Sequence, residues 1–319
     1  MDFVFYDLET TGISPEFDQP LQFAAIWTDE NFVEKDRVNI RCRLAPHILP
    51  SPQALVVTRV TPDQLTDPNL PSLFEFSQQV AEFTERWAPA IWVGYNTMKF
   101  DEEVLRQTFY QNLSPNIYAT QFNGKTRFDI LPAVYAAYAR HPDLIVWPID
   151  DTGRRSFKLD RLAPANGFNA HNAHDALGDV EATIHIARLI ATRSPALWSE
   201  LIDNAYKARV QAKLESFRPY ELVTRFGGGE TFSSPQIARE IPVTMSSLKT
   251  CAVFAWIGSK RPRSPMIGSR RTRASILRPM RRDRSDRFTR TTSSAVSCGG
   301  SAQPPRRRPG SLSFIQNRK

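Results

Sequence analysis

The sequence predicts an α/β fold in which helices flank a mixed β-sheet, and three observations lead to this prediction. Three apolar strand-like stretches come first, at Phe3–Leu8, Leu21–Trp27 and around Arg37–Leu44, with links too short for crossover helices. Residues 72–87 then carry apolar side chains at three- and four-residue spacing, which indicates an amphipathic helix. The apolar stretch Ile91–Asn96 follows that helix and can therefore pair in parallel. Antiparallel and parallel pairs together make the sheet mixed.

The remaining elements are mostly helices. A proline-punctuated loop at residues 46–52 precedes Thr61-Pro62-Asp63, where a capping residue followed by proline predicts a helix start. The later elements are a helix that begins at or near Asp101, an edge strand at Arg127–Leu131 leading into a helix through His141, a short helix from Ser156 that ends by Pro164 and Gly167, a long helix after Asp175, and a helical connector over residues 196–217.

The positive charge of the chain is concentrated in its last part. The whole chain of 319 residues has a net charge of +8. Residues 246–319 hold 15 Arg and 3 Lys against two Asp, a net charge of +16, so residues 1–245 carry a net charge of −8. The basic composition therefore gives no reason to expect that the N-terminal globule binds nucleic acid through overall charge.

The composition also indicates the cellular compartment in which we expect the protein. The chain has three widely spaced cysteines, Cys42, Cys251 and Cys298, which suits a reducing cytosol and argues against a metal–thiolate site. No apolar run approaches the length of a membrane span, and Asp2 and Asp7 interrupt the N-terminus where a signal peptide would be apolar. We expect a cytoplasmic protein without a membrane partner.

The first strand ends in a pair of carboxylates. Asp7 and Glu9 are two residues apart, so their side chains share one face of the strand. Buried carboxylates need a partner, and a hard divalent cation is one. The alternative is a strand that ends in a solvated acidic turn, and this pair alone does not decide between the two interpretations. Further carboxylates from elsewhere in the chain would favour the metal site.

Asp101 is a second candidate. It follows a strand and opens a helix, the place where sites form in α/β sheets, and a neighbouring strand would bring it over Asp7 and Glu9. An Asp at a helix start is also a common cap, which is the competing interpretation. Arg106 lies one turn further into the helix, where it could meet a phosphate or simply face solvent.

The third candidate lies at the start of the long helix. His174 precedes the first turn, and Asp175 and Asp179 are four residues apart. We interpret Asp175 as the helix cap and assign Asp179 to metal binding. The reference pKa of a histidine side chain is near 6.5, so His174 could accept a proton at neutral pH.

These motifs together resemble a known family. Asp7-x-Glu9, Asp101, and His174 followed by Asp179 are similar to the three exonuclease motifs of the DEDDh branch of the ribonuclease-H-like 3′→5′ exonucleases. The resemblance to the bacterial exodeoxyribonuclease I family within that branch covers about residues 1–235 and rests on further stretches, namely Gln22-Phe23-Ala24-Ala25-Ile26, Gly94-Tyr95-Asn96, Phe100-Asp101-Glu102-Glu103-Val104, Ser156-Phe157-Lys158-Leu159, and Ala165-Asn166-Gly167 with Asn172-Ala173-His174-Asp175-Ala176. Thr11-Gly12 departs from that family and is nearer to the general branch.

The resemblance implies a ribonuclease-H-like three-layer fold and Mg²⁺-dependent hydrolysis of single-stranded DNA to 5′-mononucleotides in DNA repair. Two Mg²⁺ ions, for which Mn²⁺ can substitute, would be held by Asp7, Glu9, Asp101 and Asp179, with His174 as the base. Glu9 would also bind the substrate. The other implied substrate-binding residues are Lys158, Arg106 and Arg127.

The resemblance also implies the domains and partners. We expect an exonuclease domain at residues 1–195, a connector with the start of a small SH3-like β domain at 196–245, and a disordered Arg-, Ser- and Pro-rich tail at 246–319, interpreted as a frame-shift product. The expected partners are single-stranded DNA and single-stranded-DNA-binding protein, and the expected state is a monomer. The alternatives are an exonuclease that acts on RNA or proofreads a polymerase, and a truncated DNA-binding chain without useful catalysis.

Overall fold

A mixed five-stranded sheet lies at the centre of the fold, as the sequence predicts. The computed structural model describes residues 1–169, 175–216, 219–225 and 231–237. The strand order is β3-β2-β1-β4-β5, with β1–β2 and β2–β3 antiparallel and β1–β4 and β4–β5 parallel. The strands are β1 (Phe3–Thr10), β2 (Pro20–Thr28), β3 (Glu34–Arg41), β4 (Ile91–Gly94) and β5 (Thr126–Asp129).

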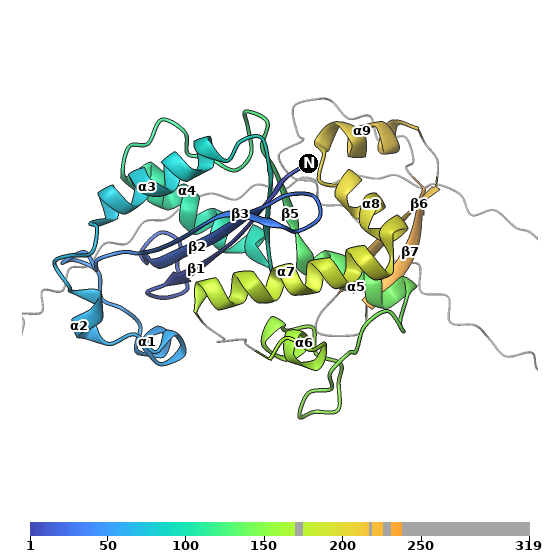
Figure 1. Cartoon of the computed structure of the whole chain (residues 1–319), viewed down its shortest axis with the longest axis horizontal. Helices are drawn as coiled ribbons and strands as arrows, with labels where there is room; N and C mark the ends of the chain where they lie inside the picture. The colour runs from blue at the N-terminus through green and yellow to red at the C-terminus, as the bar shows by residue number, and fades with distance from the viewer. Residues whose placement is uncertain (170–174, 217–218, 226–230, 238–319) are drawn as a thin grey trace, which may run out of the picture. The chain divides into compact units, whose positions relative to one another are not determined.

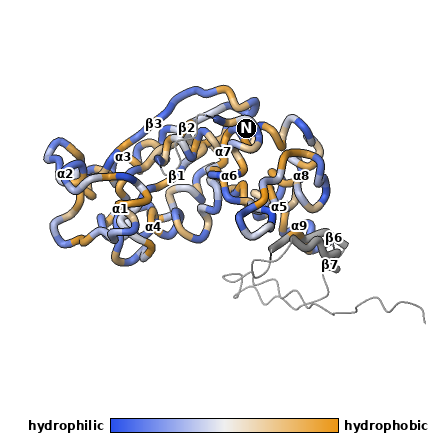
Figure 2. Tube along the Cα trace, turned by 90° about the horizontal axis from the view of Figure 1, so that it is seen from below, coloured by the Kyte–Doolittle hydropathy of each residue, from blue (hydrophilic) through white to orange (hydrophobic). Residues whose placement is uncertain are grey.

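Helices cover both faces of this sheet and give three layers (Figure 1). The helices are α1 (Pro52–Thr58), α2 (Pro62–Leu65), α3 (Leu73–Arg86), the 3₁₀ turn η1 (Thr97–Lys99), α4 (Asp101–Gln111), α5 (Ile130–Arg140), α6 (Leu159–Ala165), α7 (Ala176–Arg193), α8 (Pro195–Asp203) and α9 (Lys207–Glu215). One hydrophobic cluster joins the sheet to α3 and α4, and another joins it to α5, α6, α7 and α8. The hydrophobic stretches gather around β1 and α7 in the middle of the molecule (Figure 2).

Alternation along β1 decides which cluster each side chain joins. Phe3 and Phe5 belong to the cluster on the α7 side, and Tyr6 belongs to the cluster on the α4 side. Because side chains two apart share a face, Asp7 continues the face of Phe3 and Phe5 toward α7. The pattern predicted that Asp7 and Glu9 point the same way, and the fold directs that face at α7.

Strand β4 is shorter than its neighbour, and this leaves room for α4. Only Phe3–Phe5 of β1 pair with Ile91–Val93 of β4, so the second half of β1 extends past the end of β4. Gly94 closes β4 where an added Cβ would lie 2.1 Å from the Thr97 side chain, so a larger residue would displace the turn. The chain then turns through η1, and the start of α4 occupies the position beside the free half of β1.

Most predicted elements are present, with differences at their boundaries. The third strand is Glu34–Arg41, earlier than the predicted Arg37–Leu44. Helix α1 was missed because its residues 52–58 include no buried side chain, so no apolar period marks it. Pro164 lies inside α6 rather than ending it. Thr61 forms a capping box with Gln64 at the start of α2, as its sequence indicates.

The region after the sheet contains helices and one hairpin. The predicted connector is two helices, α8 and α9, and Trp198 of α8 packs against Phe3, Phe32 and Phe128 near the sheet. Strands β6 (Pro219–Arg225) and β7 (Thr231–Ile237) pair antiparallel. This hairpin is the described part of the predicted SH3-like domain, so the domain boundaries stay a prediction. The predicted tail lies outside the described residues. None of the described helices combines the length and apolar character needed to cross a bilayer.

Candidate active site

Three of the predicted metal-binding carboxylates meet where β1 approaches the start of α7. Asp7, Glu9 and Asp179 each offer an oxygen, and these oxygens all lie within 4.8 Å of one another. Asp7 and Glu9 come from the α7-facing side of β1, and Asp179 lies in the first turn of α7. Glu9 and Asp179, which are 179 − 9 = 170 positions apart in the sequence, therefore lie in one cluster, because α7 crosses the sheet over the end of β1.

Asp101 reaches the same cluster from the other side of the strand. It is the first residue of α4, and its side chain is 7% exposed. A hydrogen bond to the main chain of Leu8 holds its carboxylate beside the free half of β1. The charge of Asp101 acts on Asp7, which places the fourth carboxylate next to the other three. The N-cap position of α4 is Phe100 and no side chain caps the helix, so Asp101 is not the cap.

Burial and mutual repulsion favour the protonated forms of these acids. Burial, followed by the charges of Asp101 and Asp179, raises the pKa of Asp7 well above its usual range. Burial, followed by Asp179 and Asp175, raises the pKa of Glu9 to about 7, although Arg41 acts in the opposite direction. Burial also raises the pKa of Asp101 to about 8. A cation bound among these acids would favour their ionised forms and lower their pKa values.

The donor set fits a hard divalent cation. The cluster offers carboxylate oxygens only, which are the ligands that Mg²⁺ and Mn²⁺ prefer, and the close approach of three such oxygens allows one ion to contact all of them. Asp7, Glu9 and Asp179 would hold such an ion, and Asp101 is near enough in charge to share it.

Asp175 has a different role from the predicted one. It occupies the N-cap position of α7, but its side chain makes no capping hydrogen bond, so the capping interpretation of this side chain was wrong. Its carboxylate instead accepts a hydrogen bond from Gln22 Nε2 over 2.9 Å and lies 3.5 Å from Arg41 Nη2. These contacts hold the start of α7 on β2 and β3.

Gln22 and Arg41 are contacts that the sequence analysis missed. Gln22 is the register partner of Glu9, and it is a buried amide within an otherwise apolar strand. A buried amide in such a strand needs a hydrogen-bond partner, and that was the available signal. Arg41 gave no comparable signal, because an Arg at a strand end is ordinarily a surface residue.

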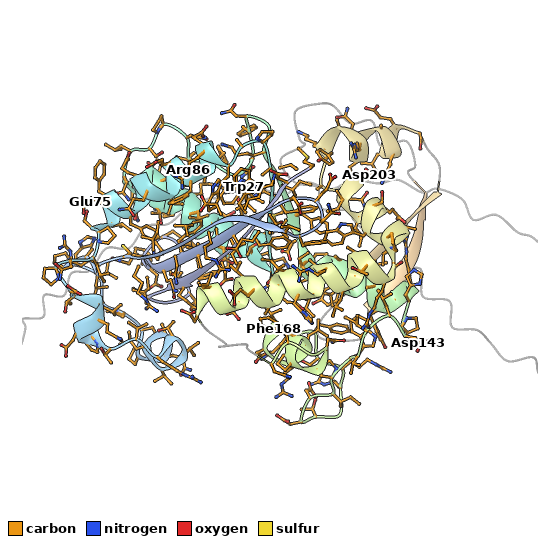
Figure 3. The ribbon with its side chains drawn as sticks, viewed as in Figure 1. Trp27, Glu75, Arg86, Asp143, Phe168 and Asp203 are labelled. Carbon is orange, nitrogen blue, oxygen red and sulfur yellow. The ribbon has the colours of Figure 1, made fainter. Side chains whose placement is uncertain are left out.

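His174 lies outside the described residues, so its assignment as the base stays a prediction. The residues that precede it are well anchored. Phe168, labelled in Figure 3, lies with its ring 5.4 Å from that of His185, and His185 Nε2 is 2.9 Å from the Asn166 carbonyl oxygen. The described chain through Asn166 and Phe168 is therefore held beside α7.

The three predicted substrate-binding cations have different surroundings. Lys158 is exposed at the N-cap position of α6. Arg106 donates to Glu103 over 2.8 Å and stacks over Tyr118 at 5.0 Å from the ring centroid. Arg127 donates to the buried carboxylate of Glu102 over 2.9 Å. Among the described residues Lys158 has no ion-pair partner to give up, whereas Arg127 already has a buried partner in Glu102.

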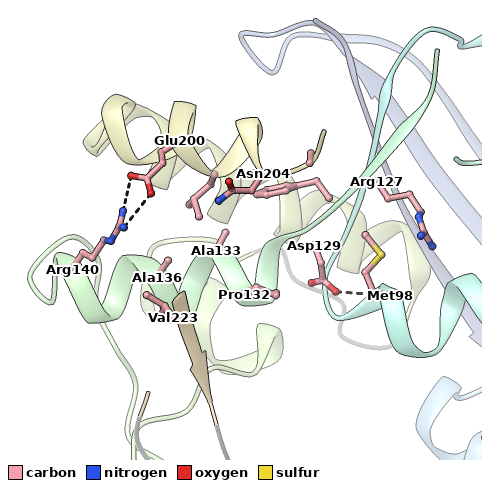
Figure 4. A pocket seen from close by; sticks show the side chains of 13 residues that line it. Met98, Arg127, Asp129, Pro132, Ala133, Ala136, Arg140, Glu200, Asn204 and Val223 are labelled. Atoms are coloured by element: carbon pink, nitrogen blue, oxygen red, sulfur yellow. Dashed lines mark hydrogen bonds and ion pairs between the residues drawn. The ribbon is translucent and has the colours of Figure 1, made fainter. Parts of the chain in front are cut away.

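A cavity of about 350 Å³ lies on different elements, near α5 and α8 (Figure 4). Arg140 and Glu200 form a two-pronged ion pair across it, at 2.7 and 3.1 Å. Asp129 also lines it, but this carboxylate already accepts the backbone N–H groups of Asn96 and Leu131. The cavity is lined by none of the four clustered carboxylates, so it is separate from the candidate active site.

Comparison with known proteins gives consistent relatives. Exodeoxyribonuclease I of Haemophilus influenzae is 37% identical over 217 residues, which are 67% of this chain and 45% of that protein. E. coli exonuclease I in complex with a dA16 oligonucleotide superposes with a TM-score of 0.66 and 34% identity over 73% of this chain and 51% of that one. An ExoI/SSB-Ct complex gives a TM-score of 0.66 and 33% identity over 74% of this chain and 52% of that one.

The chain spans about half the length of the relatives that it matches. The family model described as Exonuclease (RNase_T) matches residues 4–187, a range that contains Asp7, Glu9, Asp101 and Asp179. The chain belongs to the RNase_T exonuclease family.

Proposed function

We propose that this chain is a Mg²⁺-dependent 3′→5′ exonuclease that degrades single-stranded DNA to 5′-mononucleotides. The observation that carries the proposal is the meeting of Asp7, Glu9 and Asp179 within 4.8 Å, with Asp101 beside them, in a chain of an exonuclease family. Two Mg²⁺ ions, when bound, supply the positive charge that stabilises the attacking and leaving oxygens of phosphodiester hydrolysis. Mn²⁺ has the same ligand preference and is expected to substitute.

The residues of the chain then have separate tasks. Asp7, Glu9, Asp101 and Asp179 hold the cations, and burial keeps water from screening that charge. Glu9 in addition faces the terminal 3′-hydroxyl of the substrate. His174 takes the proton of the attacking water, which raises the nucleophilicity of the oxygen as it approaches phosphorus. Lys158 and Arg106 are proposed to contact the DNA backbone, where a cation pairs with a phosphate.

Arg127 is a weaker candidate for DNA contact than its place in the family resemblance suggests. Its guanidinium is engaged by the buried Glu102, so a phosphate would have to compete with a carboxylate that has few other sources of charge compensation. We therefore propose a phosphate contact only for the part of the guanidinium that does not pair with Glu102. This contact is possible because the Arg127 side chain is 26% exposed.

The choice of single-stranded DNA follows the relatives, of which one was solved with a dA16 oligonucleotide. The same relatives suggest the C-terminal segment of single-stranded-DNA-binding protein as a partner, since one complex contains it. A role in DNA repair and a monomeric state complete the proposal. The proposed domains remain residues 1–195, 196–245 and 246–319.

Digestion of 3′-labelled substrates by the purified chain tests this function. Single-stranded DNA, single-stranded RNA and duplex DNA would each be incubated with Mg²⁺, with Mn²⁺ and with excess chelator. We expect labelled mononucleotides from single-stranded DNA, restored by either ion and abolished by chelation. Faster release from RNA would contradict the substrate assignment, and binding of single strands without release of nucleotides would indicate a DNA-binding chain that has lost catalysis.

A further inference from the structure

Glu102 is a buried carboxylate that the proposed chemistry does not use, although it directly follows Asp101. Its side chain is 3% exposed. It lies on the α4-facing side of the sheet, where Tyr6 of β1 also lies, whereas Asp7 faces α7. Glu102 is therefore next to the candidate metal site in sequence but separated from it by the thickness of the strand.

Four hydrogen-bond distances describe the surroundings of this carboxylate. Tyr6 donates its hydroxyl to Oε1 over 2.5 Å, and the Thr120 hydroxyl lies 3.0 Å from Oε1 and 2.9 Å from Oε2. Arg127 Nη1 donates to Oε2 over 2.9 Å. Both oxygens thus accept hydrogen bonds, and the donors come from β1, from the loop after α4 and from β5.

The network connects the two backbone segments that carry Asp7 and Asp101. Tyr6 immediately precedes Asp7 in β1, and Glu102 immediately follows Asp101 in α4. Strand β4 does not support this half of β1, because its pairing stops at Phe5 and Val93. The side-chain bond from Tyr6 to Glu102, together with the bond from Asp101 to the Leu8 main chain, takes the place of the missing strand contacts.

We propose that Glu102 is a positioning residue for the candidate metal site. With Tyr6, Thr120 and Arg127 it fixes the first turn of α4 on β1, and so it sets how closely Asp101 approaches Asp7. This inference rests on the proposed function, because it assigns a task to Glu102 only if Asp7 and Asp101 hold cations.

Packing alone does not account for this network. A buried ionic group is often replaceable by apolar residues of the same volume without loss of stability, so stability is a weak reason to bury one. Hydrogen bonds, in contrast with apolar contacts, fix both distance and direction. Loss of a residue that orients metal ligands without itself binding the metal typically lowers metal affinity or activity by about 10–100-fold. The network therefore fixes the position of α4 relative to β1, which apolar packing alone would not do.

Three variants of the full chain test the proposal against one control. Tyr6→Phe removes a single hydroxyl, Glu102→Leu removes the carboxylate, and Glu102→Gln keeps an oxygen that Tyr6 can reach. The control is Lys125→Met, which breaks the ion pair of another buried side chain, that of Lys125 with the exposed Glu85 at 2.9 Å, in the same loop region. The measurements are Mn²⁺ affinity by calorimetry without DNA, the melting temperature without metal, and kcat and KM on single-stranded DNA.

We expect Tyr6→Phe and Glu102→Leu to lower Mn²⁺ affinity and kcat by about 10–100-fold, the usual effect of losing a partner that orients metal ligands. KM should not change, and Glu102→Gln should retain more Mn²⁺ affinity than Glu102→Leu. Lys125→Met should lower the melting temperature and leave Mn²⁺ affinity intact. If Glu102→Leu does not fold, Tyr6→Phe decides, since it keeps the packing of the ring.

Unchanged Mn²⁺ affinity and kcat in Tyr6→Phe, with only a lower melting temperature as in Lys125→Met, would overturn the inference and leave the proposed function standing. A parental chain that binds no Mn²⁺ and releases no nucleotide would overturn the proposed function itself, and the two failures are therefore distinguishable.

Discussion

Asp101 and Glu102 are neighbours in the first turn of α4, and both are buried, yet their surroundings are opposite. Glu102 has hydroxyl donors from Tyr6 and Thr120 and the guanidinium of Arg127. Asp101 has hydrogen bonds to the main chain and the acids Asp7 and Glu9 beside it, and its pKa is raised to about 8 by burial. One carboxylate is compensated by the protein, and the other is left for a ligand to compensate.

The difference shows how one helix start can serve structure and chemistry at once. Consecutive residues in the first turn point about 100° apart, so Glu102 reaches Tyr6 between α4 and the sheet, while Asp101 reaches the main chain of Leu8 beside Asp7 and Glu9. The hydrogen-bond donors of the protein surround Glu102. The uncompensated acids gather near the end of β1, where we propose that a cation and a substrate bind.

The largest effect should follow from removing an uncompensated acid. We expect Asp7→Asn, Asp101→Asn or Asp179→Asn to abolish Mg²⁺-dependent release of mononucleotides while the protein stays folded, because each removes a ligand charge from the cluster. Initial rates on 3′-labelled single strands and circular dichroism measure the two properties. Near-parental activity in any one of the three would remove that residue from the metal site.

A smaller effect should follow from replacing the predicted base. His174→Ala should lower kcat by about 10²–10⁴-fold, the typical contribution of general acid–base catalysis. Mn²⁺ affinity should stay at the parental value, since the clustered oxygens come from the acids. A variant that keeps its kcat but loses affinity for single strands would show that His174 binds substrate. The matched control is His185→Ala, which alters the neighbouring anchor at Asn166.

Much of this arrangement could be predicted from the sequence, for reasons that particular residues make clear. Strand alternation placed Asp7 and Glu9 on one face, while the helix-start position placed Asp101 near a strand end and Asp179 at the opening of the long helix. These are local rules, and the family resemblance joined the motifs into one site. The central sheet followed from link lengths in the same way.

The contacts of the other side chains were not predictable by local rules. Nothing near Asp175 in the sequence indicates that Gln22 and Arg41 would hold it. The sequence analysis assigned no partner to Glu102 and gave Arg127 only as a substrate contact implied by the resemblance, because their ion pair depends on how the loop with Thr120 folds over α4. Such pairs are fixed by tertiary packing between segments far apart in the chain, so no local pattern indicates them.

The smallest effect we consider is on stability without metal, and its sign differs between the two neighbours. The pKa of Asp101 is raised from 3.8 to about 8, so the folded protein holds a proton that the unfolded chain releases between these values. The free energy of unfolding of the metal-free protein should therefore fall as pH rises from about 4 to about 8. Each tenfold change in proton affinity corresponds to about 1.4 kcal/mol, so Asp101→Asn should raise the free energy of unfolding at pH 8 by on the order of a few kcal/mol and flatten its pH dependence. Glu102→Gln should instead lower it by about 1–3 kcal/mol, because Arg127 loses its carboxylate acceptor and would face an amide N–H₂ group. Urea unfolding in excess chelator at pH 5 and pH 8 measures both. Equal losses in the two variants would mean that the protein itself compensates Asp101, and the contrast between the two carboxylates would not hold.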